Sequence, residues 1–149
     1  MTQTSQGKLY GLGIGPGDPE LLTLKAHRIL TSVPVIAYPT MESGKVLARA
    51  IVASFIRPEQ IELPMPLPFS VERSSQPYYD QSAEHIAQHL SEGRDVAVLC
   101  EGDPMLYGSF MYILIGYQTA LIPKWCQEFL QPLPAPRCWV PRSPTATMC

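Results

Sequence analysis

Two short runs of glycine, aspartate and proline carry the residue types and spacing in this sequence that could do chemistry. The first is Gly-Leu-Gly-Ile-Gly-Pro-Gly-Asp-Pro over residues 11–19, and the second is Gly-Asp-Pro over residues 102–104. Each follows an apolar segment typical of a buried strand and precedes a new helix. Such turns bring bare backbone close to a ligand at the carboxyl end of a parallel sheet. The sequence therefore predicts two turns that contact a ligand.

The first turn lacks the features of two common phosphate sites. Pro16 stands at the sixth position counted from Gly11, where a dinucleotide-binding Gly-x-Gly-x-x-Gly turn has its third glycine. Proline has no N–H to offer a pyrophosphate. No Gly-Lys-Ser or Gly-Lys-Thr is present, which excludes a P-loop. Taken alone, the turn could also serve only to join a strand to a helix that Asp18 caps and Pro19 begins.

Alternating strand and helix patterns position these turns. We expect strands over residues 33–38, 60–63 and 95–100, and helices over residues 45–55 and 78–92. The proline-rich residues 64–77 are predicted to form a loop, long enough to suggest a functional flap. This order predicts an α/β fold with a mostly parallel sheet flanked by helices. Both Gly-Asp-Pro turns then lie beyond the carboxyl ends of strands.

The two turns together resemble the tetrapyrrole methylases, which methylate uroporphyrinogen and the precorrins with S-adenosylmethionine. The N-terminal signature of that family is matched by Gly-Ile-Gly-Pro-Gly-Asp-Pro-Glu-Leu-Leu-Thr-Leu-Lys-Ala over residues 13–26, and the second motif by residues 99–109. Further segments are most similar to the precorrin-2 C20-methyltransferases of cobalamin (corrin) synthesis: residues 7–11, 35–39, 61–66 and 109–112. The resemblance implies the N-terminal half of a two-domain class III methyltransferase.

The resemblance also implies which residues meet the cofactor S-adenosylmethionine. Glu101, Gly102 and Asp103 are expected to line it, Leu106 to pack on it, and Pro16 to border the same cleft. Glu101 replaces a glycine of the uroporphyrinogen enzymes, and Asp103 could also cap a helix that begins at the next residue.

One residue is expected to face the substrate. Tyr38 ends a strand at the ligand edge, where some relatives carry an acid, and is a candidate for contact with the tetrapyrrole. Core packing is the alternative for this side chain. No residue is assigned as the acceptor of the proton lost from C20, so the catalytic residues stay unassigned.

The composition of the chain argues against nucleic-acid binding, membrane insertion, secretion and metal binding. The chain has 149 residues, a net charge of −2 and no cluster of Lys or Arg, which gives no reason to expect nucleic acid. No apolar segment is long enough for a membrane span, and the polar residues 1–7 are unlike a secretory signal, so we expect a cytoplasmic protein. His85 and His89 are spaced to share a metal, but they lie in an amphipathic helical pattern, so no metal is expected.

The last part of the chain reads differently from the rest. We expect three regions: a disordered N-terminus over residues 1–6, the α/β domain over residues 7–114, and an irregular tail over residues 115–149. Residues 124–131 can be encoded by DNA that reads Val-Val-Pro-Gly-Val-Ser-Ser in another frame, which resembles the continuation of the family. We therefore expect that a frameshift near Leu114 produced the tail and that the second domain is missing. Sequencing the coding DNA tests this expectation.

Three interpretations of function stay open. The first is methyl transfer from S-adenosylmethionine to C20 of precorrin-2, in an enzyme whose full-length relatives form homodimers. A variant of the first is a methylase that acts on another tetrapyrrole carbon. The second is a non-catalytic remnant of that enzyme, and we expect the chain itself to be inactive. The third is a nucleotide-binding α/β module, which Pro16 disfavours.

Overall fold

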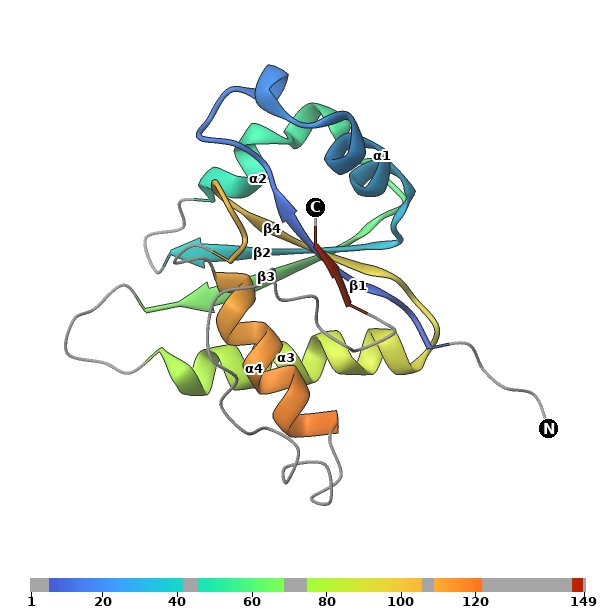
Figure 1. Ribbon diagram of the computed structural model, residues 1–149, viewed down its shortest axis with the longest axis vertical. Helices are drawn as coiled ribbons and strands as arrows, with labels where there is room; N and C mark the ends of the chain where they lie inside the picture. The colour runs from blue at the N-terminus through green and yellow to red at the C-terminus, as the bar shows by residue number, and fades with distance from the viewer. Residues whose placement is uncertain (1–5, 42–45, 69–74, 106–108, 122–145, 149) are drawn as a thin grey trace, which may run out of the picture.

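A parallel sheet between two layers of helices forms the part of the chain that the computed structural model describes, residues 6–41, 46–68, 75–105, 109–121 and 146–148 (Figure 1). Its strand order is β3-β2-β4-β1-β5. The strands are β1 (Leu9–Gly13), β2 (Val35–Met41), β3 (Ile61–Leu67), β4 (Val96–Cys100) and β5 (Ala146–Met148). All of these neighbours pair in parallel. The predicted α/β fold with a mostly parallel sheet is confirmed.

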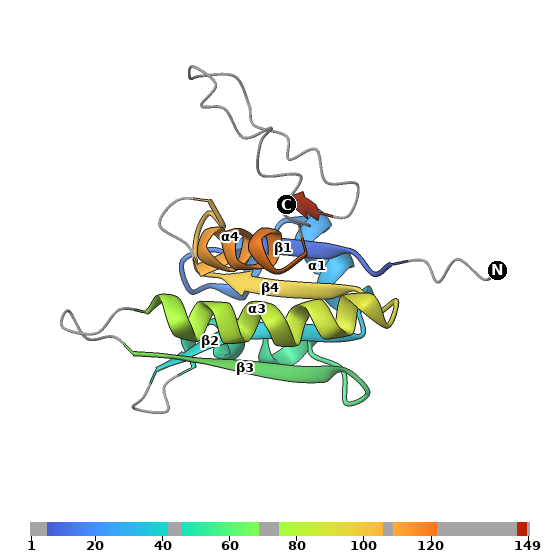
Figure 2. The same ribbon diagram turned by 90° about the horizontal axis from the view of Figure 1, so that it is seen from below.

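In the described part of the chain, helices cover both faces of the sheet, which Figure 1 shows edge-on and Figure 2 shows from one side. The helices α1 (Leu24–Ser32) and α2 (Leu47–Ile51) lie on one face, and α3 (Gln76–Ser91) and α4 (Ser109–Leu121) lie on the other. Successive side chains of a strand point to opposite faces of the sheet. The central strands β1, β2 and β4 therefore contribute buried side chains to the packing on both faces. In β4, for example, Leu99 packs toward α1 and α2, whereas Val98 packs toward α3 and α4.

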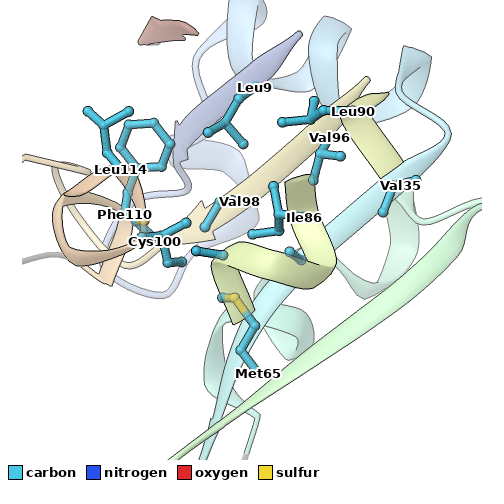
Figure 3. Packing of buried hydrophobic residues seen from close by; sticks show 13 residues of the cluster. Leu9, Val35, Met65, Ile86, Leu90, Val96, Val98, Cys100, Phe110 and Leu114 are labelled. Atoms are coloured by element: carbon cyan, nitrogen blue, oxygen red, sulfur yellow. The ribbon is translucent and has the colours of Figure 1, made fainter. Parts of the chain in front are cut away.

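The α4 layer depends on a close approach to β1. Phe110 is fully buried between α4 and the sheet, in a cluster with Leu9, Cys100 and Leu114 (Figure 3). A Cβ atom at Gly11 would lie 2.7 Å from Cδ1 of the Phe110 ring. Gly11 therefore leaves the space in which the aromatic ring sits on the strand.

The helix after β1 starts later than the sequence predicts. Asp18 accepts a hydrogen bond from Glu20 N at 2.9 Å and caps a short 3₁₀ turn, Pro19–Leu21. The helix α1 begins at Leu24, and its cap is Thr23, whose Oγ1 accepts from Ala26 N at 3.1 Å. Asp18 thus caps a helical turn that begins at Pro19, as predicted, but the turn is short and α1 has its own cap, Thr23, just before the apolar stripe.

The strand β3 extends through residues predicted to be a loop. It includes Pro64 and Pro66, and only the later part of the 64–77 segment lies outside it. Ile61 N donates to Pro34 O at 2.8 Å, so odd-numbered residues of β3 direct their N–H toward β2. Pro64 and Pro66 then lie at positions that face the open edge of the sheet, where a missing N–H breaks no ladder hydrogen bond.

The remaining boundaries shift by a few residues. The strand β2 continues through Pro39 to Met41, and the predicted helix over residues 45–55 is divided into α2 and a 3₁₀ turn, Ala53–Phe55. The helix α4 runs to Leu121, past the predicted boundary at residue 114. Most of the predicted frameshifted tail, residues 122–145, lies outside the described residues.

Candidate functional site

The two glycine turns meet at the carboxyl edge of the sheet. β1 and β4 are neighbours, with Gly13 in register with Cys100. Beyond them, Ile14 N donates to Cys100 O at 3.0 Å, and Gly102 N donates to Gly15 O at 3.3 Å. Gly15 and Gly102 form an antiparallel bridge. The predicted juxtaposition of the two turns at one rim is therefore observed, and main-chain hydrogen bonds hold it.

The backbone of both turns requires glycine. Gly15 and Gly102 have φ angles of 78° and 71°, a left-handed conformation that side-chain-bearing residues rarely adopt. A Cβ atom at Gly13 would lie 2.5 Å from the carbonyl oxygen of Gly102, which is too close for any side chain. At Gly102 the Cβ direction leads into open space, with nothing within 4 Å. Gly13 thus permits the close contact between the turns, and Gly102 leaves open space next to that contact.

A cleft of about 400 Å³ opens where the turns meet. Its described lining combines the backbone of both turns with side chains from the start of the first helical segment: Gly13, Gly15, Leu21, Thr23, Gly102, Asp103 and Pro104. Among these lining residues, Asp103 alone is charged and Thr23 alone carries a hydroxyl. The cleft is therefore mainly apolar, with one anionic group and one neutral hydrogen-bonding group.

Asp103 is held by its own turn. Its Oδ1 accepts a hydrogen bond from Met105 N at 2.8 Å. The described part of α4 begins at Ser109, so Asp103 caps the local turn at Pro104 and Met105 rather than a helix that starts at Pro104. The predicted helix cap is wrong in this respect. The same side chain lines the cleft.

The predicted cofactor residues divide into three groups. Gly102 and Asp103 line the cleft as expected. Pro16 and Glu101 are exposed neighbours of the two turns and are not among its lining residues. Leu106 lies outside the described residues.

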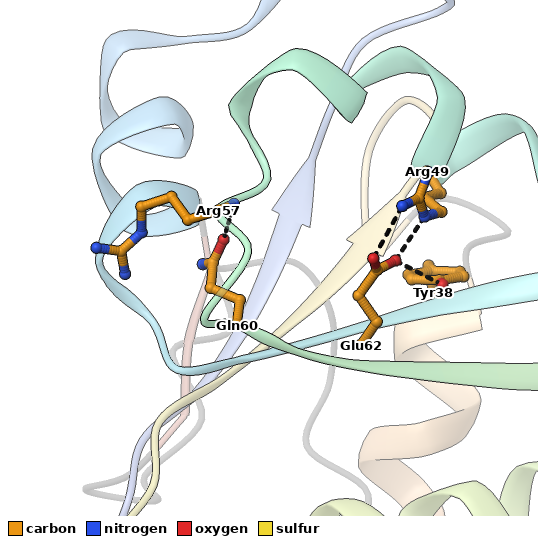
Figure 4. A network of polar contacts seen from close by, with 5 residues as sticks. All are labelled: Tyr38, Arg49, Arg57, Gln60 and Glu62. Carbon is orange, nitrogen blue, oxygen red and sulfur yellow. Dashed lines mark hydrogen bonds and ion pairs between the residues drawn. The ribbon is translucent and has the colours of Figure 1, made fainter.

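Tyr38, the predicted substrate-facing residue, is engaged within the protein. Only 6% of it is exposed, and its hydroxyl donates to Glu62 Oε2 at 2.8 Å. Arg49 Nη2 donates to Glu62 Oε1 at 2.8 Å, so the carboxylate joins β2, β3 and α2 (Figure 4). Burial, and then the bond to Glu62, raise the pKa of Tyr38. Hydrogen bonding from Arg49 lowers the pKa of Glu62.

Sequence reasoning missed part of the cleft lining. Gly13 and Gly15 belong to the motif that was read as the ligand turn, but Leu21, Thr23 and Pro104 were not singled out. Thr23 could have been found from its position just before the apolar helical pattern, where a threonine acts as a cap. Leu21 is 57% exposed, which the helical spacing of its neighbours gives no reason to expect.

Other reactive side chains are not grouped into a second chemical site in the described part of the chain. No cluster of three or more metal-ligating residues occurs there, His85 and His89 included. Burial raises the pKa of the Cys100 thiol to about 12, so this cysteine is protonated at neutral pH and a poor nucleophile. Of the helices within the described ranges, none is both long enough and apolar enough to cross a membrane.

Known proteins are similar to the part of this chain that contains both glycine turns. The family profile of Tetrapyrrole (Corrin/Porphyrin) Methylases matches residues 8–122. Over 122 residues, the chain is 41% identical to a precorrin-2 C(20)-methyltransferase of Sinorhizobium sp., which covers 76% of this chain. It is 40% identical over 119 residues to the cobalamin biosynthesis protein CobIJ of Mycobacterium tuberculosis, which covers 74% of this chain.

A solved structure agrees with these matches. Uroporphyrin-III C-methyl transferase from Thermus thermophilus, complexed with S-adenyl homocysteine, superimposes with a TM-score of 0.56 at 26% identity and covers 78% of this chain. The chain spans 42% of that structure, 50% of the Sinorhizobium protein and 23% of CobIJ. Since the family profile covers most of the chain, including both glycine turns, the chain belongs to the tetrapyrrole (corrin/porphyrin) methylase family.

Proposed function

We propose that this chain provides the cofactor-binding half of an S-adenosylmethionine-dependent methyltransferase that acts on C20 of a precorrin-2-type tetrapyrrole. Membership of the family supports the reaction type. The name of the Sinorhizobium relative, at 41% identity, supports the carbon and the substrate. The solved relative in complex with S-adenyl homocysteine supports the cofactor.

The residues of the cleft fit this cofactor. S-adenosylmethionine supplies a methyl group already activated on a positively charged sulfonium. Asp103 places a negative charge at the wall of the cleft, which favours a cationic ligand. Gly102 keeps the space beside its Cα open, and Leu21 and Pro104 offer apolar contact to the uncharged parts of the cofactor. These residues would hold the cofactor.

The contribution of the chain to the reaction is then positional. Because the methyl group needs no further activation, rate enhancement depends on holding it in line with a nucleophilic carbon. The two turns are suited to this task, since main-chain hydrogen bonds between residues 14–15 and 100–102 fix them to each other and to the central strands. Tyr38, with its hydroxyl bonded to Glu62, supports the fold at this edge, and we assign it no contact with the substrate.

The bridge between Gly15 and Gly102 is the observation that carries the proposal, because it builds the cleft from bare backbone. Isothermal titration calorimetry of the chain with S-adenosylhomocysteine tests it. Gly102→Val directs a side chain into the open space and should weaken binding by at least about tenfold. Gly93→Val is the matched control. Gly93 has a similar φ of 80°, but it follows the C-terminal end of α3 and does not line the cleft. Equal binding by both variants would contradict the proposed site.

Methyl transfer itself distinguishes the enzyme from a non-catalytic remnant. A non-catalytic remnant of such an enzyme is the second candidate, and the chain spans half the length of the Sinorhizobium relative. Incubation with precorrin-2 and methyl-labelled S-adenosylmethionine should give a product labelled at C20. Label at another carbon would support a different tetrapyrrole methylase, and cofactor binding without labelled product would support the remnant.

A further inference from the structure

Within the cofactor cleft, the distribution of hydrogen-bonding groups is uneven. Only two of the described lining side chains are polar: the carboxylate of Asp103 and the hydroxyl of Thr23. The others are glycine, leucine and proline, which offer no polar side-chain atom. A ligand with a positive and a negative group at one end must therefore bind these groups through Asp103, Thr23 and the backbone.

Three backbone donors of the two turns are already engaged within the protein. Ile14 N donates to Cys100 O at 3.0 Å, Gly102 N to Gly15 O at 3.3 Å, and Met105 N to Asp103 Oδ1 at 2.8 Å. These three N–H groups belong to the two turns that build the cleft. Since they are used in hydrogen bonds between the turns or within one of them, these three N–H groups are not free to bind an anionic group of a ligand.

Thr23 is the side chain that can still donate. Its Oγ1 accepts the N–H of Ala26 at 3.1 Å, which fixes the oxygen at the start of α1. A hydroxyl that accepts one hydrogen bond keeps its own hydrogen for another partner. Because this oxygen is already positioned by the helix, donation to a ligand in the cleft needs little further ordering.

We infer that Thr23 orients the amino-acid end of the cofactor by donating a hydrogen bond to its carboxylate, with the ammonium group on the side of Asp103. This inference rests on the proposed function. Like charges repel, so the cofactor carboxylate is disfavoured beside Asp103, whereas the ammonium and sulfonium groups are attracted to it. The pair of residues thus selects one direction of the cofactor in the cleft, and Thr23 acts as a positioning residue.

Two substitutions separate this role from helix capping. Thr23→Ser keeps both the capping oxygen and the hydroxyl donor. Thr23→Asp keeps a strong capping acceptor but has no hydrogen to donate and adds a negative charge. If Thr23 served only as a cap, the unmodified chain and Thr23→Ser would bind S-adenosylhomocysteine no better than a ligand that lacks its carboxylate. Thermal unfolding of each variant confirms that α1 is still capped.

Calorimetry with two ligands completes the test: S-adenosylhomocysteine and its analogue that lacks the carboxylate. The unmodified chain and Thr23→Ser should prefer S-adenosylhomocysteine by about tenfold or more, the usual effect of one hydrogen bond to a charged group. Thr23→Asp should lose this preference. The comparison of ligands on the unmodified chain does not depend on any variant folding.

Each outcome decides the inference. Equal binding of both ligands by the unmodified chain would contradict it, as would a preference that Thr23→Asp retains. A loss of affinity for both ligands to the same extent in Thr23→Asp would assign Thr23 to another part of the cofactor and overturn the inference. If the unmodified chain binds neither ligand, the proposed function is wrong and the inference falls with it.

Discussion

Gly102 donates its backbone N–H to the carbonyl oxygen of Gly15 at 3.3 Å, and both residues have a positive φ. Through this pairing, the segments after two neighbouring strands form one surface, although 87 positions separate the residues in the sequence. Main-chain atoms rather than side chains make the contact. The predictions about the cleft follow from this geometry.

The contact between the turns should be sensitive to a single methyl group at Gly13. Gly13→Ala places a Cβ about 2.5 Å from Gly102 O, so the turns must separate. We expect a loss of about 1–3 kcal/mol in the free energy of unfolding, the usual effect of overpacking, and weaker binding of S-adenosylhomocysteine. Urea denaturation and calorimetry measure the two effects. Gly102→Ala is the control for stability: its Cβ meets open space, so only backbone strain of about 1–2 kcal/mol should remain. A smaller cost for Gly13→Ala than for Gly102→Ala would contradict this account.

A buried glutamine joins α1 to the start of β3. Gln60 Nε2 donates to Leu30 O and to Val33 O, each at 2.7 Å, and its Oε1 accepts from Arg57 N at 2.8 Å (Figure 4). Gln60→Glu keeps the shape but replaces the two donated bonds with a carboxylate that faces carbonyl oxygens. We expect destabilisation by about 2–4 kcal/mol at neutral pH, since a charged group is left unsatisfied in a buried place.

Urea denaturation of this variant at several pH values measures the effect. Part of the loss should be recovered in acid, where a protonated carboxyl can donate one hydrogen bond. Gln88→Glu, at an exposed position of α3, is the matched control and should change stability by less than about 0.5 kcal/mol. Equal effects at the two positions would show that the Gln60 contacts do not stabilise the fold.

Among the described strands, β3 forms an edge of the sheet, and this edge is protected by proline. Pro64 and Pro66 stand where the backbone would otherwise direct N–H groups outward. Replacing both with valine should restore a pairing edge and increase self-association, which sedimentation velocity measures over a range of concentrations. Pro58→Val, in the turn before β3, should leave the chain's association unchanged. Association that rises equally in both variants would assign it to general destabilisation.

The ion pair between Arg49 and Glu62 predicts a small loss of stability in acid. Hydrogen bonding from Arg49 lowers the pKa of Glu62 below its ordinary 4.5, so the folded state binds fewer protons than the unfolded chain in this range. The contribution is full above pH 4.5 and is lost as the pH falls through the lowered pKa. It should be below about 1 kcal/mol, because the side chains are 41% and 29% exposed.

Denaturation of the Glu62→Gln variant measures this contribution. The stabilities of the variant and the unmodified chain should differ at neutral pH and converge in acid. Tyr38→Phe retains the ion pair, so the Arg49 contribution should still be lost in acid in that control. A difference for Glu62→Gln that is constant with pH would contradict the assignment.

The sequence predicts which helices and strands form better than it predicts the residues at which they begin and end. Glycine, aspartate and proline at residues 11–19 and 102–104 determine local backbone geometry, so both turns and their common edge were predictable. The extension of β3 through Pro64 and Pro66 was not, because it depends on β3 being an edge strand, a property of the assembled sheet. The predicted frameshift concerns mostly residues outside the described ranges and stays a prediction for the coding DNA.

The side chains of the site divide in the same way. Asp103 follows from its motif, whereas Thr23 lines the cleft from a position just after a 3₁₀ turn that the sequence did not predict. Tyr38 has the position of a ligand-facing residue at the end of a strand. Its hydroxyl is bonded to Glu62, which lies 24 positions away in the sequence, and such a partner depends on the register of β2 and β3.

Whether the two paired turns form the cofactor site is tested most directly by nuclear magnetic resonance of the ¹⁵N-labelled chain during titration with S-adenosylhomocysteine. The account predicts that the largest shifts occur at the amides of Gly13, Gly15, Gly102 and Asp103, which line the cleft. Shifts confined to the separate recess between β3 and α3, at Tyr78 and His85, or no shifts at saturating ligand, would contradict it.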